Sequence, residues 1–284
     1  MLYSKTYGLQ KETRNYLRRL YTFNRELVSS DIADLDNFIK GTKQLGIWQS
    51  MICWPLRSQH NLGSGSTVLS LGGLGNYNGS MVNSPTWGSN AITFTGSSSQ
   101  AISVNQLPLI SPRGFSIASL YSRDALYGST ATNCGFDDSV LGTQCGIADA
   151  NNGFTGFAAT LNTGATVGGN ATNAVGGIGS NTYNFCLGTF NLHSLLCNQH
   201  LYTAPGSYSA NSGYYSISTS IPRDTIIRGT ATSRFAIGQW GANQARNFNG
   251  KISATFFFTI DVTNVQSSLY NLIKTTIGKG LGLP

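Results

Sequence analysis

The positions of hydrophobic residues divide this sequence of 284 residues into two parts with different periods. Up to about residue 62, apolar residues recur every three or four positions, which is typical of amphipathic helices. The first helical stripe contains Tyr16, Leu20, Phe23 and Leu27. The pattern therefore predicts a helical N-terminal module over residues 1–62.

A second helix is predicted to begin near residue 29. Either Ser29 or Ser30 can cap its N-terminus, and Asp31 lies near its positive end. Its apolar stripe is formed by Ile32, Leu35, Phe38 and Ile39. We expect both helices to pack on the segment that follows them.

From about residue 63 the apolar residues alternate with polar ones, and this change of period predicts strands. About ten short alternating runs are separated by turn residues such as Gly, Asn and Ser. Strands at this spacing favour a sandwich or a barrel over βαβ units. We therefore expect residues 63–284 to form a mainly β domain that is built as an antiparallel sandwich.

The last predicted strand, KISATFFFTI, carries large apolar residues on both faces. Its alternation places Ile252, Ala254, Phe256 and Phe258 on one face. Phe257 then points to the other face, which is typical of a central strand that is covered on both sides. The period becomes helical after Thr263, which is a reasonable cap for a short closing helix.

Composition supports an all-β protein and shows an uneven distribution of charge. Only 10% of residues are charged, against about 25% in an average domain, while Gly, Tyr and Phe are abundant. The net charge is +7, and half of the 18 Lys and Arg residues fall in the first 57 positions. Because there is no long basic run, zinc spacing or RNA-binding motif, we expect no nucleic acid partner. A basic segment of this kind suits an acidic protein surface better.

The sequence lacks signals for export and for membrane insertion. Its first residues lead into charges instead of an apolar segment, so no signal peptide is predicted. No run approaches the roughly 18 apolar residues of a membrane span. We therefore expect synthesis and assembly in a cytoplasm, with the five cysteines reduced.

The end of the chain resembles the last strand and closing helix of laminin-G-like, or concanavalin-like, jelly rolls. The matching residues are Phe248, Gly250 and Ile252, followed by VQSSLYNLI. The opening strands of that family resemble the segment with Trp87, Ile92, Phe94 and Gly96. The resemblance covers about residues 75–275 and implies an antiparallel jelly-roll β-sandwich.

A shorter resemblance concerns the end of the second helix. Lys43, Gly46, Ile47 and Trp48 are similar to a turn that precedes jelly rolls in proteins of tailed bacteriophages. It implies a structural protein on the virion surface, as capsid decoration or as a neck, tail or fibre component. The expected partners are other virion proteins, host or environmental glycans, and further copies of the chain. The alternatives are a free carbohydrate-binding lectin and a glycoside hydrolase of concanavalin-like fold.

Candidate catalytic residues are scarce in the β part of the chain. Most glycoside hydrolases need two carboxylates, yet there is no Glu after residue 60 and the Asp residues are scattered. The three histidines and the serines form no recognisable triad motif. We therefore expect no catalytic residues and no cofactor, and a protein that is not an enzyme.

Calcium is the one metal that the sequence suggests. Asp137, Asp138 and Asp149 lie in neighbouring segments with Asn151 and Asn152, and oxygen ligands suit Ca²⁺. The resemblance to laminin-G-like domains implies the same, because many of them hold calcium in a rim site. The alternative is that these residues occupy turns, which Asp and Asn favour.

A sugar site needs an aromatic platform surrounded by amide or hydroxyl groups. Two segments offer this combination: Tyr214 with Tyr215, and Trp240 with Asn243 and Gln244. The alternative is that these aromatic residues pack inside the sandwich.

The first predicted helix is a candidate for attachment to the particle. Its cationic residues are Arg14, Arg18, Arg19 and Arg25, and its apolar anchors are Tyr16, Leu20 and Phe23. We expect this helix to bind an acidic surface of a capsid or tail protein. The alternative is a solvated charged face without a partner.

Overall fold

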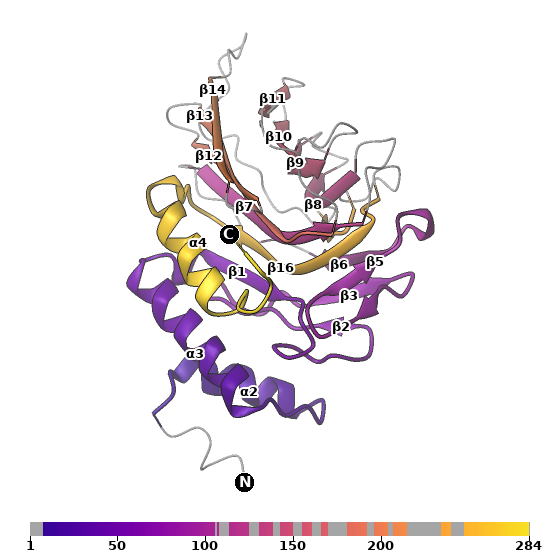
Figure 1. The fold of residues 1–284 in the computed structure, drawn as a ribbon, viewed down its shortest axis with the longest axis vertical. Coiled ribbons are helices and arrows are strands. Elements are labelled where there is room, and N and C mark those ends of the chain that lie inside the picture. The colour runs from indigo at the N-terminus through magenta and orange to yellow at the C-terminus, as the bar shows by residue number, and fades with distance from the viewer. Residues whose placement is uncertain are drawn as a thin grey trace.

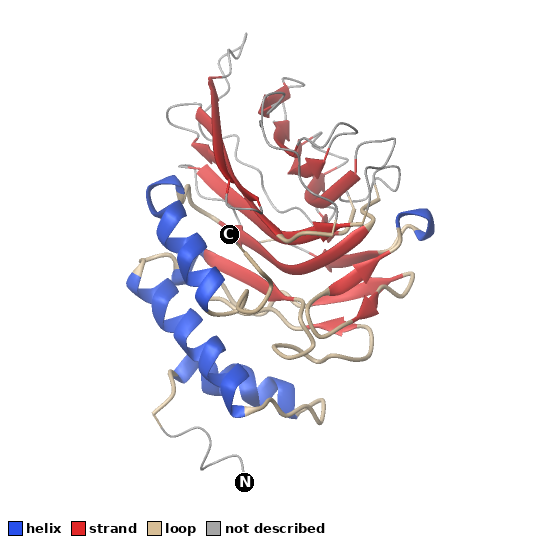
Figure 2. Ribbon diagram, viewed as in Figure 1, coloured by secondary structure: helices blue, strands red, loops and turns tan. Residues whose placement is uncertain are grey.

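The protein is mainly β, with two antiparallel sheets and a few helices (Figures 1 and 2). The computed structural model describes residues 8–105, 107, 114–124, 131–138, 143–149, 155–160, 166–169, 181–191, 196–203, 207–214, 234–239 and 247–283. Within these residues the three α-helices gather on one side of one sheet (Figure 2).

Sheet A has eight strands and is organised around its central strand, β16. Its strands are β1 (Met51–Pro55), β4 (Thr86–Trp87), β5 (Ile92–Phe94), β7 (Gly114–Arg123), β12 (Asn184–Asn191), β13 (Leu196–Thr203), β14 (Ser207–Tyr214) and β16 (Gly250–Phe258). They follow the order β14-β13-β12-β7-β16-β5-β4. Strand β7 pairs along one edge of β16, while β5 and β1 share the other edge.

Sheet B also has eight strands, and all its pairings are antiparallel. Its strands are β2 (Thr67–Val68), β3 (Gly79–Val82), β6 (Ala101–Asn105), β8 (Ala131–Asp138), β9 (Thr143–Asp149), β10 (Thr155–Thr160), β11 (Thr166–Gly169) and β15 (Arg234–Ile237). They follow the order β11-β10-β9-β8-β15-β6-β3-β2.

The core between the two sheets is built largely from aromatic side chains. Phe257 of β16 lies 6.1 Å from Phe235 of β15, and Phe235 stacks on Trp54 of β1 at 5.1 Å, measured between ring centroids. All three side chains are fully buried. Since they come from both sheets, sheets A and B enclose one apolar core, which confirms the predicted two-layer β architecture.

A second core covers the opposite face of sheet A. Three helices contribute to it, α2 (Lys11–Tyr21), α3 (Ser29–Gln44) and α4 (Gln266–Thr275). Phe38 of α3 lies 6.1 Å from Phe256 of β16, and Tyr270 of α4 lies 5.7 Å from Phe185 of β12. Figure 1 shows α3 and α4 next to each other on this side of β16. Sheet A is thus buried on both faces, as its near-continuous apolar strands require.

A β-bulge changes the predicted facing of β16. The pairing of β16 with β7 shifts its register between Ile252 and Ala254. Ile252 therefore shares the core between the sheets with Phe257, whereas Ala254 and Phe256 face the helices. The expectation that Ile252 lies on the same face as Ala254 is wrong, because a bulge inserts one residue and inverts the alternation. The central position of the strand is confirmed.

The helix ends differ from the sequence prediction. Helix α3 begins at Ser29 with Val28 as its N-cap residue, and no side chain caps it. The serines already lie inside the first turn, where they lack the N-cap backbone geometry. Thr263 lies in the 3-10 helix η3 (Thr263–Val265), where its hydroxyl donates to Asp261 Oδ1 at 2.6 Å instead of capping α4. The other 3-10 helices are η1 (Trp48–Ser50) and η2 (Gly96–Ser98).

The division into residues 1–62 and 63–284 remains a prediction. Met51–Pro55, which the sequence pattern placed in the helical module, forms β1 and pairs with the second half of β16. Cys53 in this strand is a free thiol, and burial raises its pKa. The helical module is therefore joined to sheet A by backbone pairing as well as by the second core.

Phe257 of β16 faces the core between the sheets, and Phe256 faces the core beneath the helices. We therefore expect both Phe256→Ala and Phe257→Ala to destabilise the protein. Each change leaves a large cavity, and we expect each to lower the free energy of unfolding by about 3–5 kcal/mol. Urea unfolding followed by tryptophan fluorescence measures this. The control is Phe23→Ala, at an exposed phenylalanine, which should cost less than about 1 kcal/mol. Similar losses in all three variants would contradict the two-core arrangement.

Candidate functional site

The loops predicted to bind sugar lie mostly outside the described residues. Tyr214 is the last residue of β14, where its backbone pairs with Leu196 of β13. Tyr215, Trp240, Asn243 and Gln244 are not among the described residues. Sugar binding by these loops therefore stays a prediction.

The three aspartates proposed as calcium ligands are not brought together by the backbone register. Asp138 pairs with Thr143 at one end of the β8–β9 hairpin, and Asp149 pairs with Ala131 at the other end. Seven residues of an extended strand separate these two ends, or roughly 23 Å. A calcium ion binds oxygen at about 2.3–2.6 Å, so one ion cannot join Asp149 to the pair Asp137–Asp138. The expected three-aspartate site is corrected accordingly.

The predicted attachment helix does not present its apolar residues to a partner. Tyr16 and Leu20 are 1% and 0% exposed, because they face the second core together with the helices and sheet A. The Tyr16 hydroxyl donates to the carbonyl of His60 at 2.9 Å, and burial raises the pKa of that hydroxyl. Tyr16 and Leu20 are thus residues of the fold, and their expected role as anchors is corrected.

Most of the arginines in the same segment are also used within the chain. Three of them donate to backbone carbonyl oxygens at 2.7–2.9 Å: Arg14 to Leu9, Arg19 to Ser70 and Arg25 to Ser58. Arg18 is exposed and has no hydrogen-bond partner among the residues that the structure describes. The helix therefore does not offer a continuous basic face, since a guanidinium that binds its own chain is not fully available to another protein.

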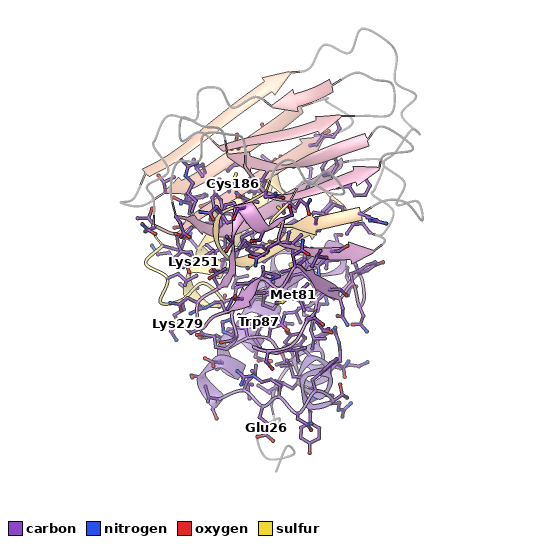
Figure 3. The ribbon with its side chains drawn as sticks, turned by 90° about the vertical axis from the view of Figure 1, so that its right-hand side faces the viewer. Glu26, Met81, Trp87, Cys186, Lys251 and Lys279 are labelled. Carbon is purple, nitrogen blue, oxygen red and sulfur yellow. The ribbon has the colours of Figure 1, made fainter. Side chains whose placement is uncertain are left out.

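The turn that joins α2 to α3 is exposed and apolar. Tyr21, Phe23 and Val28 are 53%, 51% and 61% exposed, and we call this group the α2–α3 tip. Glu26, in the middle of the turn, lies at the end of the molecule opposite the outer strands of the sheets (Figure 3). Of the three predicted anchors, Phe23 alone is thus placed where another protein can reach it.

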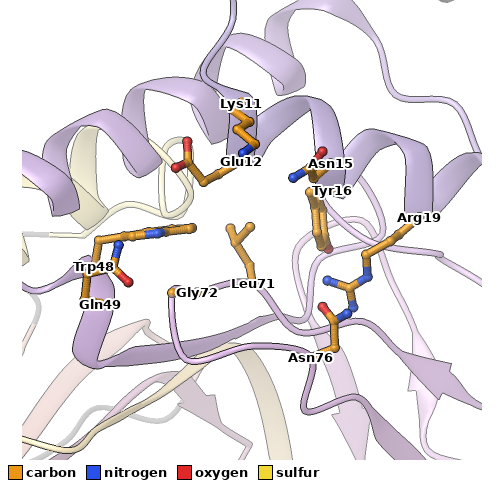
Figure 4. Close-up of a pocket in the computed structure, with 11 residues that line it drawn as sticks. Lys11, Glu12, Asn15, Tyr16, Arg19, Trp48, Gln49, Leu71, Gly72 and Asn76 are labelled. Carbon is orange, nitrogen blue, oxygen red and sulfur yellow. The ribbon is translucent and has the colours of Figure 1, made fainter.

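A pocket of about 370 Å³ lies between α2 and the loop that joins β2 to β3 (Figure 4). Helix α2 lines one side with Lys11, Glu12, Asn15, Tyr16 and Arg19. Helix η1 and the loop line the other side with Trp48, Gln49, Leu71, Gly72, Gly73 and Asn76. In Figure 4 the rings of Trp48 and Tyr16 flank the pocket, with Leu71 between them.

The end of α3 positions Trp48 in the pocket wall. Gly46 adopts a φ of +73°, and its N–H donates to Lys43 O at 3.1 Å. The N–H of Ile47 donates to Thr42 O at the same distance. These two bonds define a Schellman motif, which ends a helix at a residue with left-handed backbone, most often glycine. The turn of Lys43, Gly46, Ile47 and Trp48 is therefore a helix stop that turns the chain towards the pocket.

The β2–β3 loop closes on β1 at two adjacent glycines, Gly72 and Gly73. The N–H of Leu71 donates to Cys53 O at 2.7 Å, and the N–H of Gly73 donates to Trp48 O at 3.0 Å. Gly72 has a φ of +147°, and a Cβ at this position would collide with Met51 O. The pair Gly72–Gly73 thus lets the loop approach the strand closely enough to form the base of the pocket.

Charges of both signs line the pocket. Lys43 Nζ lies 3.1 Å from Glu12 Oε2. Partial burial acts to raise the pKa of Glu12, but hydrogen bonds with its own backbone and with Lys43 outweigh this and lower the pKa. On the other side, the Arg19 guanidinium lies 5.7 Å from the centre of the Tyr16 ring, and burial lowers its pKa. The Glu12–Lys43 ion pair and the Arg19 guanidinium therefore frame the cavity, and Lys11 adds a third charged group to its lining.

The pocket also has polar groups that are available to a ligand. Within the described part of the chain, the side chains of Lys11, Asn15, Gln49 and Asn76 have no hydrogen-bond partner. Amides beside aromatic rings match the hydroxyl groups and the apolar face of a sugar. The volume is near the lower end of the usual range for ligand pockets, about 300–1,000 Å³, and thus suits a small polar group.

Sequence reasoning missed this pocket, because its two sides are between 29 and 65 residues apart in the chain. The double glycine in SLGGLGN was the one local signal, since adjacent glycines often mark a close approach of the backbone. Nothing in the sequence indicated that α2 is the element that lies opposite it.

Comparisons with known proteins identify similar folds but no family. No protein-family profile matches the chain, and no curated protein matches its sequence. A Trypanosoma rangeli sialidase in complex with sialic acid matches 81% of this chain and 33% of its own, with a TM-score of 0.51 and 11% identity. The same enzyme with a difluorinated sugar acid matches 87% and 40%, with a TM-score of 0.50 and 10% identity.

A phage protein is also among the similar structures. Tailspike protein 2 from an Escherichia coli O157:H7 bacteriophage matches 64% of this chain and 24% of its own, with a TM-score of 0.47 and 13% identity. The chain thus spans between a quarter and two fifths of the length of these proteins. At such low identity the likeness to the sialidases shows the fold alone, and the likeness to the tailspike carries no argument about function.

These matches correct the expectation that the protein is not an enzyme. Among the similar structures, sialidase chains share its fold at TM-scores of 0.51 and 0.50. The expectation relied on the lack of paired carboxylates, but sialidases are among the glycosidases that use a tyrosine nucleophile instead. The residue criterion was therefore too narrow to exclude catalysis, although the matches do not assign an activity. No helix among the described residues is long and apolar enough to cross a membrane.

The position of Gly72 leads to a test of the pocket's base. Gly72→Ala places a methyl group against Met51 O and forces alanine into a strained backbone conformation, so we expect unfolding to become easier by at least about 2 kcal/mol. The control is Gly65→Ala, where φ is also positive but no atom lies within 4 Å, with an expected cost near 1 kcal/mol. Chemical denaturation of both variants measures the difference. Equal costs would show that the loop does not press on β1.

Proposed function

We propose that the protein is a glycan-binding structural protein on the surface of a tailed phage particle. The observation that carries glycan binding is the pocket beside α2, which Trp48 and Tyr16 flank. Its side-chain amides have no hydrogen-bond partner among the described residues: Asn15, Gln49 and Asn76. The virion role rests on the sequence resemblance of the turn from Lys43 to Trp48. The finer description of the sandwich as a laminin-G-like jelly roll belongs to the same proposal.

Two places on the molecule are candidates for the bound sugar. The pocket is one of them, because its walls and polar groups are supplied by three elements that the second core holds together. The loops with Tyr214, Tyr215 and Trp240, Asn243, Gln244 are the other. A chain in which both sites bind sugar would hold a polysaccharide at two points. Avidity would increase further when several copies are displayed on one particle.

Attachment to the particle is assigned to the α2–α3 tip. An exposed apolar group that is bordered by charge is typical of a protein interaction site. Arg18 is exposed one helical turn before the tip, and the first 57 residues hold nine Lys and Arg against five Asp and Glu. The partner that fits is an acidic patch of another virion protein, with an apolar pocket for Phe23. Symmetric repetition of the partner would then arrange this chain as an oligomer.

Glycan binding is tested with pocket variants. We expect Asn15→Ala and Gln49→Ala each to weaken binding of a host-surface polysaccharide by about tenfold, because each removes a hydrogen-bonding amide. Glycan microarrays identify the ligand, titration calorimetry measures the affinity, and an assay for released reducing ends shows whether the glycan is cleaved. The control is Asn37→Ala on the exposed side of α3, outside the pocket. A loss confined to Trp240→Ala would place the site in the loops, and no binding to any glycan would refute the proposal.

Attachment is tested by incorporation into particles. Phe23→Asp and Val28→Asp place charges in the apolar tip, and we expect each to lower the copy number per particle at least about tenfold. Quantitative mass spectrometry of gradient-purified particles, normalised to the major capsid protein, measures this. Val82→Asp, at an exposed apolar residue of β3, is the control. Unchanged copy numbers would refute the role of the tip, and absence of the unaltered protein from particles would favour a free lectin.

A further inference from the structure

The segment from Arg57 to Asn61 forms hydrogen bonds with the α2 side of the helical module and with the C-terminal part of the chain. The Tyr16 hydroxyl and the Arg25 guanidinium, from the α2 side, donate to carbonyl groups of this segment at 2.9 and 2.7 Å. Arg57 Nη1 donates to Ile277 O at 2.8 Å, in the C-terminal part of the chain. Residues from three distant parts of the sequence therefore meet here, and polar groups at this junction are largely removed from water.

His60 in this segment has an unusual environment. Its side chain is 0% exposed, and neither Nδ1 nor Nε2 has a hydrogen-bond partner in the structure. A buried polar group without a partner costs free energy, so an unmatched pair of ring nitrogens calls for an explanation. Burial, together with the nearby Arg57 guanidinium, lowers the pKa of His60 to about 3. One ring nitrogen of a neutral imidazole carries a lone pair, so this buried side chain offers an electron-pair donor to a ligand.

Two carboxylates face this imidazole from α3. Asp31 and Asp34 are three residues apart in the first turns of the helix, so their side chains lie on the same face. One oxygen of each carboxylate and one nitrogen of His60 all lie within 4.8 Å of one another. Two carboxylates at this separation repel each other unless a cation lies between them.

We propose that Asp31, Asp34 and His60 form a binding site for a divalent cation of the zinc type. One imidazole nitrogen and two carboxylate oxygens suit Zn²⁺, which takes both kinds of ligand in four-coordinate sites. A cation gives the buried nitrogen its missing partner and removes the repulsion between the carboxylates. The atoms must draw together to about 3.4 Å, the spacing set by bonds of roughly 2.0–2.1 Å. Both aspartates are only partly buried, so their side chains have room to move.

The positive groups around the site set its selectivity. Arg57 and Arg25 act on Asp31, and Lys279 Nζ lies 3.4 Å from Asp34 Oδ1. Arg57 is held by backbone oxygens of Ile277 and Lys279, and Arg25 by that of Ser58, so these two cations stay in place. The Lys279 side chain is 63% exposed, and it can swing into solvent when a cation takes its place beside Asp34. A cation must displace Lys279 from Asp34, and Zn²⁺, which binds nitrogen and carboxylate ligands strongly, does so more readily than Mg²⁺ or Ca²⁺.

The bound cation would act as a staple. It links the N-terminal end of α3 to the loop after β1, next to the turn that carries the α2–α3 tip. Because the unfolded chain keeps the three ligands apart, most of the binding free energy adds to the stability of the folded state. This site is independent of the glycan pocket, which shares none of its three ligands.

The test uses the full chain after treatment with a chelator and dialysis. Titration with Zn²⁺ in a calorimeter should show one ion per chain, and the melting temperature should rise by about 5 °C once the ion is in hundredfold excess over its dissociation constant. Addition of Co²⁺ should give the visible absorption of a low-coordinate site with nitrogen and oxygen ligands. These readouts require no knowledge of the protein's activity.

Matched variants keep the proposal falsifiable. Asp31→Asn and Asp34→Asn keep the shape of partly exposed side chains, so they should fold, and each should weaken Zn²⁺ binding at least about tenfold. His60→Gln should abolish the Co²⁺ absorption. Glu26→Gln removes the same charge from the exposed turn nearby and should leave binding unchanged. A wild-type chain that does not bind Zn²⁺, or Zn²⁺ binding that survives undiminished in either aspartate variant, would overturn the proposal.

Discussion

Burial of β16 on both faces is the constraint on which the rest of the structure depends. Phe257 fills the core between the sheets, while Phe256 and Phe258 fill the core beneath the helices. A strand of this composition cannot be left with one face in water, because each exposed phenylalanine would cost on the order of 2 kcal/mol. The helices are therefore required partners of sheet A, and the helical segment at the start of the chain is part of the fold.

Hydrogen bonds from arginine side chains add to the apolar cores in holding the helical segment to the rest of the fold. The arginines of the first helical segment and Arg57 bind backbone carbonyl groups that would otherwise be buried without partners. An arginine is well suited to this task, since its five donors reach several oxygens from one rigid plane. Much of the positive charge at the start of the chain thus serves the internal structure. What remains for another protein is the α2–α3 tip, with Arg18 beside it.

Helix α2 contributes to two features of functional interest. Its buried side fixes Tyr16 against sheet A, its residues from Lys11 to Arg19 line the pocket, and its end leads into the exposed tip. A helix that is held by a core and by carbonyl contacts presents side chains at fixed positions, as a binding site requires. Ligand binding and attachment would thus share one rigid support.

The sequence by itself determined the kinds of elements and their order. Periods of 3.6 and 2 residues predicted helices up to about residue 62, strands from about residue 63, and a central strand followed by a closing helix, because side-chain facing in one element depends on local repeat alone. Tertiary structure decided the rest. The bulge after Ile252, the burial of Tyr16 and Leu20, and the pocket between α2 and Gly72 all depend on neighbours that are distant in the chain. Asp31 and His60 illustrate the limit, since they are 29 positions apart and meet because the second core packs α3 against the segment after β1. The local pattern of a segment indicates which of its side chains can be buried. The packing of all segments decides which residues those side chains are buried against.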